Sequence, residues 1–441
     1  MKISKYINGT SALQAFQLIR FGTLLLISIL FTKNGLSVSD IGSYETVMLI
    51  SGAISFFWIT GLIQSFLALF RNNQSIHDIK NGSRSPEIFN LFFMVTIFSI
   101  ASCLFIILFR NFLTNNINNG VAIPFFNLMV IYIFLSNPAF LIEYIYLALQ
   151  HYKKMIIYGI ITYFIQLLLV CLPLFSGFGI VYCLYGLLAV TVIRICWLIT
   201  LVFKYSSIKI SFRLINEYFK FGLPLIVTAL LCNSQQYIAG FIVTSKFDAA
   251  TLAIFRFGAR DLPLVVLITS AFSNSLLPEF GRNNISDVLK KIKDKSLKMI
   301  YYLFPLAVIS LLVSKSLFPV IFNSNFAASA GIFNIFILLV VSRLVFPQTI
   351  ALGLKKTRII FWVSAAEVII NTLLALLLIN FIGLMGVGFA FVIASYSEKA
   401  IQILYLSRKQ KVKISEYIPL KQFLVGSVLI FVSFVISIYI K

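Results

Sequence analysis

Long runs of apolar residues, separated by short polar segments, make up most of this chain. A transmembrane helix needs about 20 mostly apolar residues, and most of these runs are that long or longer. The pattern therefore predicts thirteen membrane-spanning segments. They run approximately over residues 12–32, 41–70, 88–109, 122–149, 155–176, 179–203, 218–243, 250–278, 297–321, 329–354, 357–380, 384–407 and 421–440.

Short sequence matches relate the first six segments to the next six. Arg20-Phe21-Gly22 begins the first half and Lys220-Phe221-Gly222 begins the second, and the basic pair Lys153-Lys154 recurs as Lys355-Lys356. Their shared order and spacing of roughly 200 residues indicate an internal duplication. We therefore expect an all-α membrane protein with two six-helix bundles around a central cavity, a common transporter plan, plus one extra C-terminal transmembrane helix.

The polar segments suggest where the bundles begin and end. We expect an N-terminal bundle over 1–203, a cytoplasmic link over 204–220, a C-terminal bundle over 221–407, and a basic loop with the thirteenth helix over 408–441. In the link, apolar residues are interleaved with Lys209, Arg213 and Lys220. That composition suits an amphipathic helix lying in the membrane interface, and equally a plain basic tether.

Composition agrees with a membrane protein, because 60% of the residues are hydrophobic, 11% are charged and the mean hydropathy is +0.99. The net charge of +22 reflects topology. With the N-terminus inside, the cytoplasmic loops hold 25 Lys and Arg and the opposite side holds 5. This asymmetry predicts a cytoplasmic N-terminus. It leaves no basic patch for nucleic acid and favours contact with anionic lipid.

Cofactor and metal chemistry find little support in the sequence. The five cysteines lie in apolar segments without metal-ligand spacing, and there is no nucleotide-binding GxxxxGK[ST] loop. We expect no enzyme activity, no metal site and no cofactor. Coupling to a proton or sodium gradient stays open.

Charged residues inside the apolar segments are the candidate functional residues. A charge at mid-membrane costs roughly 2.5 to 3.5 kcal/mol on insertion scales, so it tends to mark a pathway or a buried pair. The arginines outnumber the acids, and arginine suits bidentate binding of phosphate or carboxylate. An anionic substrate is therefore favoured. The arginines are Arg20, Arg194, Arg256, Arg260 and Arg343, and the acids are Glu143, Asp261 and Glu367.

Two of these arginines stand near a proline. Arg256 and Arg260 are four residues apart, which predicts that they share one helix face. Pro263 follows them and should kink that helix, as Pro138 and Pro347 should kink theirs. Arg256 lies near the outer end of its segment, where it can also extend toward the interface.

A structural interpretation competes with pathway lining for every one of these charges. Glu143 with Arg194 or Arg343, and Asp261 with either neighbouring arginine, would also suit buried pairs that hold helices in register.

The sequence resembles the multidrug/oligosaccharidyl-lipid/polysaccharide exporter superfamily, and within it the polysaccharide and O-antigen flippases. Phe221-Gly222-Leu223-Pro224 is similar to the start of that family's seventh helix, and Ala253-Ile254-Phe255 stands where its members often have Gly-x-Tyr. The glycine-rich run Gly383–Gly388 resembles the start of their twelfth helix. The resemblance covers about residues 5–410. Members usually have twelve or fourteen spans, so the thirteenth here is expected to be accessory.

The resemblance implies movement of a polyprenyl-diphosphate-linked oligosaccharide between leaflets by alternating access through a cationic cavity. Its implied partners are membrane lipid, the lipid-linked glycan, and the polymerase and glycosyltransferases of the same pathway. The five arginines would be cavity cations, and the three acids would be their partners or ion-coupling groups. The alternatives are a multidrug or metabolite antiporter of the same fold and a membrane scaffold for envelope-polymer enzymes.

Overall fold

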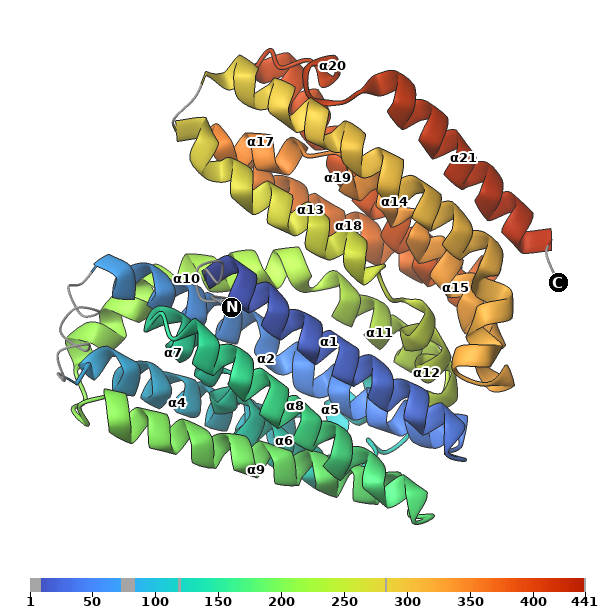
Figure 1. Ribbon diagram of the computed structural model, residues 1–441. Helices are drawn as coiled ribbons and strands as arrows, with labels where there is room; N and C mark the ends of the chain where they lie inside the picture. The colour runs from blue at the N-terminus through green and yellow to red at the C-terminus, as the bar shows by residue number, and fades with distance from the viewer. Residues whose placement is uncertain (1–8, 73–83, 118–119, 282–283, 440–441) are drawn as a thin grey trace, which may run out of the picture. The chain divides into compact units, whose positions relative to one another are not determined.

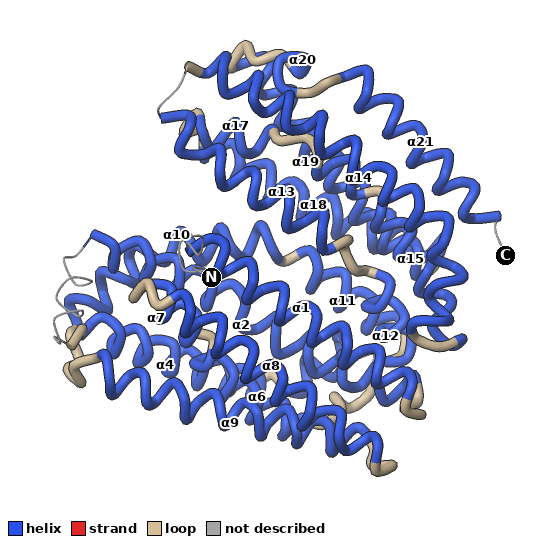
Figure 2. The backbone as a smooth tube through the Cα atoms, viewed as in Figure 1, coloured by secondary structure: helices blue, strands red, loops and turns tan. Residues whose placement is uncertain are grey.

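A computed structural model of the chain describes residues 9–72, 84–117, 120–281 and 284–439. Within these ranges the regular structure is helical, apart from an isolated bridge between Ser85 and Ser206 (Figure 2). They contain 12 helices long and apolar enough to span a bilayer. The protein is thus a multi-pass membrane protein, and the predicted segment 250–278 contains two shorter apolar helices instead of one of spanning length.

Contacts divide the chain into two compact units, each described here by itself. Unit 1 comprises Met1–Tyr237 and Thr244–Ala250, and unit 2 comprises Ile238–Val243 and Thr251–Lys441. The helices of unit 1 are α1 (Gly9–Lys33), α2 (Val38–Asn72), α4 (Pro86–Leu108), α5 (Arg110–Ile117), α6 (Phe126–Ala139), α7 (Leu141–Ala148), α8 (Tyr152–Phe175), α9 (Ile180–Tyr205) and α10 (Phe212–Asn233). The helix α11 (Gln235–Lys246) is divided between the units.

In unit 1, helix α2 lies at the centre of the core. Its Trp58, Leu62 and Phe66 are buried in a cluster that also includes Leu91 of α4 and Leu141 of α7. Around it, α1 packs along α8, and α8 packs along α9 (Figure 1). The core therefore joins the apolar faces of helices far apart in sequence.

Helix α10 packs closely along α2 because α2 presents small residues to it. A Cβ atom added at Gly61 would lie 2.6 Å from the backbone nitrogen of Ile226. One turn further, the Ser65 hydroxyl donates a hydrogen bond of 3.0 Å to the carbonyl oxygen of Tyr218. Contacts thus place α10 with unit 1, although the repeat makes it the first helix of the second half.

The link leading to α10 is extended and held by the start of α4. The Ser85 amide donates to the Tyr205 carbonyl at 2.9 Å, and the Asn90 side chain donates to the Lys209 carbonyl at 2.9 Å. Asn90 also accepts from the Ser211 amide at 2.8 Å, and Ser211 caps α10. Residues 206–211 of the link are therefore an extended segment that hydrogen bonds hold to α4. The rest of the link, from Phe212, forms the first turns of α10.

Unit 2 contains several short helices among its long ones. They are α12 (Ala249–Gly258), α13 (Pro263–Leu276), η2 (Leu277–Gly281), α14 (Ile285–Ile321), η3 (Ser324–Phe326), α15 (Ala327–Ile337), α16 (Leu339–Arg343), α17 (Pro347–Gly353), α18 (Thr357–Ile382), α19 (Leu384–Lys409), α20 (Ile414–Tyr417) and α21 (Leu420–Tyr439). The pairing of α18 with α19 is the most extensive.

Prolines break two apolar segments of unit 2. Pro263 begins α13, and Leu262 before it is extended, with φ −66° and ψ 112°. A residue before proline avoids the helical region, so α12 cannot continue into α13. Pro347 likewise begins α17 after the non-helical residues 344–346. The predicted kinks at these two prolines are therefore breaks, and this is why segment 250–278 is divided.

The extra C-terminal helix α21 is joined to α14 and α15 by buried polar side chains. The Ser314 hydroxyl lies 2.6 Å from Oδ1 of Asn334, and the Asn334 amide donates to the Ser437 hydroxyl at 3.1 Å. All three residues are at most 2% exposed. Near this site, the Lys315 amine donates to the Ile438 carbonyl at the end of α21. The thirteenth helix is thus an integral part of unit 2.

Replacing Asn334 with alanine should therefore loosen α21. The change leaves the hydroxyls of Ser314 and Ser437 without their shared partner, which we expect to cost about 1 kcal/mol. Thermal unfolding in detergent and proteolysis of the C-terminal helix measure the effect. Asn380→Ala is the matched control, because Asn380 is exposed and bonds only to its own helix. Equal unfolding temperatures for the two variants would refute this role of Asn334.

Candidate functional site

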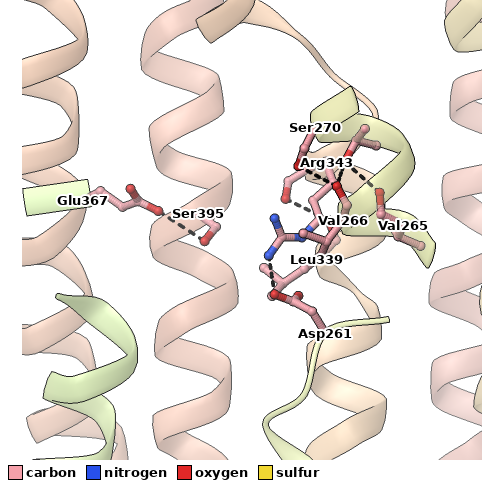
Figure 3. Close-up of polar contacts among 10 residues, drawn as sticks. Asp261, Val265, Val266, Ser270, Leu339, Arg343, Glu367 and Ser395 are labelled. Carbon is pink, nitrogen blue, oxygen red and sulfur yellow. Dashed lines mark hydrogen bonds and ion pairs between the residues drawn. The ribbon is translucent and has the colours of Figure 1, made fainter. Parts of the chain in front are cut away.

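The breaks in unit 2 bring two charged residues together. Arg343 is the last residue of α16, and its guanidinium forms an ion pair with Asp261, which lies in the break between α12 and α13 (Figure 3). The side chains are 32% and 36% exposed, and Nε of Arg343 has no hydrogen-bond partner in the described residues. The pair thus joins the two breaks in the helices, and about one third of the Arg343 side chain remains exposed.

Arg256 and Arg260 do not share a helix face, because α12 ends at Gly258. The prediction was wrong since it assumed a helix continuing to Pro263. Instead, Arg260 turns back over α12: its guanidinium lies 4.8 Å from the ring centre of Phe257, and its Nε is 3.4 Å from the Arg256 carbonyl. The two arginines still lie beside each other at the broken end of α12.

Glu367 lies on the face of α18 that meets α19. Its carboxylate accepts a hydrogen bond of 3.2 Å from the Ser395 hydroxyl of α19 (Figure 3). One turn further along α18, Asn371 is 1% exposed, and neither its amide nitrogen nor its oxygen has a partner within the described ranges. Buried polar atoms normally have hydrogen-bond partners. The side-chain oxygen and nitrogen of Asn371, beside Glu367 on α18, could therefore still bind a ligand.

Three charged residues gather inside unit 1. Glu143 of α7 is 6% exposed, and its carboxylate interacts electrostatically with Arg20 of α1 and Arg194 of α9. Arg194 donates to Oε1 of Gln166 at 2.7 Å and lies 4.8 Å from the ring centre of Tyr163. The two arginines and one acid carry a net positive charge.

A small cavity lies beside these charges. Its lining includes Tyr132, Glu143, Tyr163 and Arg194, from α6, α7, α8 and α9. Its volume is about 30 Å³, which exceeds the roughly 10 to 15 Å³ that a water molecule needs. The cavity therefore has room for water or a monatomic ion beside the charged groups.

The structure matches one predicted pairing and changes another. Glu143 interacts with Arg194, as one alternative predicted, and also with Arg20, whereas Asp261 pairs with Arg343 rather than with a neighbouring arginine. Gln166 and Asn371 were missed, since a single neutral polar residue in an apolar segment gives no strong signal. In the described part of the chain, no group of three or more His, Cys, Asp or Glu residues could hold a metal ion.

Comparison with known proteins identifies the family. A family model described as "Polysaccharide biosynthesis protein" matches residues 36–331. No curated protein matches the sequence significantly. Among solved structures, lipid II flippase MurJ in an inward closed conformation is 16% identical with a TM-score of 0.69, covering 97% of this chain and 93% of that one.

Two further neighbours are transporters of the same superfamily. An inward-facing multidrug resistance transporter of the MATE family is 12% identical with a TM-score of 0.63, covering 93% and 94% of the two chains. A transporter from Pyrococcus furiosus, described as having a binding pocket of reverse polarity, is 12% identical with a TM-score of 0.57, covering 96% and 95%. The neighbours are thus flippases and transporters, not enzymes. The chain belongs to the polysaccharide biosynthesis protein family and has the fold of the multidrug/oligosaccharidyl-lipid/polysaccharide exporter superfamily.

Proposed function

We propose that this protein is a flippase that carries a polyprenyl-diphosphate-linked oligosaccharide, an O-antigen or another surface polysaccharide unit, across a bacterial inner membrane. The observation that supports the proposal is the excess of arginine over acid among the charged residues inside the apolar segments. Five arginines, Arg20, Arg194, Arg256, Arg260 and Arg343, stand against Glu143, Asp261 and Glu367. A diphosphate is the anion that such guanidinium groups bind best.

The surroundings of the arginines fit a cationic role in binding. An arginine kept only for structure is expected to have its donors taken by protein groups. Nε of Arg194 and Nε of Arg343 are buried without a hydrogen-bond partner in the described residues. Both side chains are nevertheless held in place, Arg194 by Gln166 and Arg343 by Asp261. Guanidinium groups held in a fixed orientation suit bidentate binding of a diphosphate.

The acids differ in the roles they suit. Asp261 is a direct partner of Arg343. Glu143 borders a small cavity with room for water. Glu367 lies one turn from Asn371, whose side-chain amide has no hydrogen-bond partner among the described residues. We assign Glu143 and Glu367 as the candidates for coupling to a proton or sodium gradient.

Orientation follows from charge. The basic loops lie after every second span, so we propose a cytoplasmic N-terminus, with alternating access between the two leaflets. Pathway enzymes such as the polymerase and glycosyltransferases would be its neighbours in the membrane.

An ion-coupled multidrug or metabolite antiporter is the second candidate. It is favoured by one observation, the aromatic lining of the unit 1 cavity, where Tyr132, Tyr163 and Phe16 surround Glu143. An acid among aromatic rings suits an organic cation. The nearby arginines oppose this use, because they repel cations.

The deciding experiment compares substrates in vesicles that contain the purified protein. We expect flipping of a polyprenyl-diphosphate oligosaccharide at least tenfold faster than in empty vesicles, and no acceleration for the same lipid with a neutral linkage. Arg260→Ala should slow flipping, while Lys246→Ala, a cation outside the candidate site, should not. Equal flipping of charged and neutral lipids would contradict diphosphate recognition. Transport of organic cations alone would establish the antiporter.

A further inference from the structure

One polar contact between neighbouring helices occurs twice in this chain. In unit 1, the Arg194 guanidinium of α9 donates a hydrogen bond of 2.7 Å to Oε1 of Gln166 on α8. In unit 2, the Ser395 hydroxyl of α19 donates to Glu367 of α18 at 3.2 Å (Figure 3). Gln166 and Glu367 are 201 positions apart, and so are Arg194 and Ser395. The two contacts therefore occupy equivalent places in the duplicated halves.

The two equivalent contacts have opposite charge. In unit 2 a neutral hydroxyl donates to the Glu367 carboxylate, so that contact is negative. In unit 1 a guanidinium donates to the amide of Gln166, which is 4% exposed, so that contact is positive. A neutral amide cannot balance the charge of an arginine. Unit 1 thus has no carboxylate at the place where unit 2 has one.

The nearest acid in unit 1 is shared between two arginines. Glu143 interacts electrostatically with Arg20 and with Arg194, and the interaction with Arg20 is the larger. One carboxylate against two guanidinium groups leaves one positive charge without a counterion. Arg194 lies near the middle of α9, where an uncompensated charge in a membrane bundle is costly. A second anion beside Arg194 would remove that cost.

The cavity of unit 1 provides room for such an anion. Its volume of about 30 Å³ is sufficient for a monatomic ion, and Arg194 is part of its lining. Nε of Arg194 is buried and has no hydrogen-bond partner among the described residues. Hydroxyl groups, which can donate to an anion as the guanidinium does, also line the cavity. They include those of Tyr132, Ser136, Tyr158 and Tyr163.

We propose that unit 1 binds a monatomic anion, of which chloride is the common example, at Arg194 in this cavity. A water molecule would fill the same space but leave the guanidinium charge unbalanced. A metal cation would be repelled by Arg20 and Arg194, so the proton is the coupling ion that remains for Glu143. The anion would balance Arg194 while no diphosphate is bound, and its binding does not depend on the proposed function.

The test measures thermal unfolding of the purified full-length protein in detergent while chloride replaces gluconate at constant ionic strength. We expect the unfolding temperature to rise with chloride and then level off, because an ion that binds only the folded state stabilises it. Bromide should act in the same way. Crystals grown in bromide should show its anomalous scattering beside Nε of Arg194.

Two replacements at the duplicated contact locate the effect. Arg194→Gln removes the cation and should abolish the response to chloride. Gln166→Glu introduces the carboxylate that Glu367 provides in unit 2, and it should also abolish the response. Its unfolding temperature in gluconate should reach that of the wild type in chloride. Arg110→Gln is the control and should keep the response, because Arg110 is an exposed arginine outside the cavity that lies 4.6 Å from the Phe126 ring centre.

The assay contains no lipid-linked substrate, so a failure of the proposed flipping leaves its result unchanged. Equal unfolding temperatures of the wild type in chloride and in gluconate would overturn the anion site. A chloride response that persists in Gln166→Glu would place the ion elsewhere and refute the site as well. If sulfate raises the unfolding temperature as strongly as chloride, the response is a general salt effect, and the proposal is wrong.

Discussion

Replacing Arg343 with alanine is expected to reduce flipping of a polyprenyl-diphosphate oligosaccharide to the rate of empty vesicles. The change removes a guanidinium with a free donor and leaves Asp261 without its cation at a helix break. An uncompensated acid there would also repel a diphosphate. Initial flipping rates in vesicles with matched protein content measure the effect. Arg358→Ala is the control, because it removes an exposed arginine from the start of α18 in the same unit.

A double replacement separates binding from structure. The pair is about one third exposed, and removing one partner leaves an unpaired charge at the helix break, whereas neutralising both partners leaves none. Asp261→Leu combined with Arg343→Met should therefore restore the unfolding temperature lost in Arg343→Ala. Flipping should nevertheless stay lost, because the cation is still absent. Normal flipping by the stable double variant would show that the pair serves only to hold α16 near the break.

Replacing Gly61 with alanine should lower the unfolding temperature of the protein by several degrees. The new methyl carbon would lie 2.6 Å and 2.7 Å from the backbone nitrogen and Cα of Ile226, so α10 must move away from α2. Overpacking of this kind costs about 1 to 3 kcal/mol, and it outweighs the gain of about 1 kcal/mol that alanine usually brings to a helix. Thermal unfolding in detergent is the measurement.

Gly22→Ala is the control for Gly61→Ala. Gly22 also lies inside a long helix, α1, but its added methyl group would have no neighbour within 4 Å. Only the gain in helix propensity applies there, so the unfolding temperature should stay equal or rise. If both alanine variants unfold at the same temperature, the close approach of α10 to α2 does not contribute to stability.

The spans were predictable because the bilayer imposes one simple rule, about 20 apolar residues per crossing. Helix ends and breaks depend on local detail that hydropathy does not record. Pro263 predicted a disturbance, but the full break also involves the extended Leu262 and the early end of α12 at Gly258. The sequence pattern treated these residues as one helix and so placed Arg256 and Arg260 on a common face.

The partners of the charges were less predictable, because they are set by which helices meet. Asp261 is separated from Arg343 by 82 positions, and neither segment carries a sequence signal that indicates the other as its partner. The hydrogen bond from Arg194 to Gln166 was also hidden, since a lone glutamine in an apolar helix is ambiguous. In contrast, the preference for arginine over acid was readable directly, because each such charge is costly in a membrane.

The packing of α10 on α2 has a consequence for the history of the gene. If the two halves descend from one ancestral chain, two copies of that chain must have associated as a dimer. The first helix of each copy could then pack on either copy. In the present chain, the small residues of α2 and the extended tether held by Ser85 and Asn90 fix the seventh helix to the first half. The two halves are therefore unequal in their packing, because the first helix of the second half belongs by its contacts to unit 1.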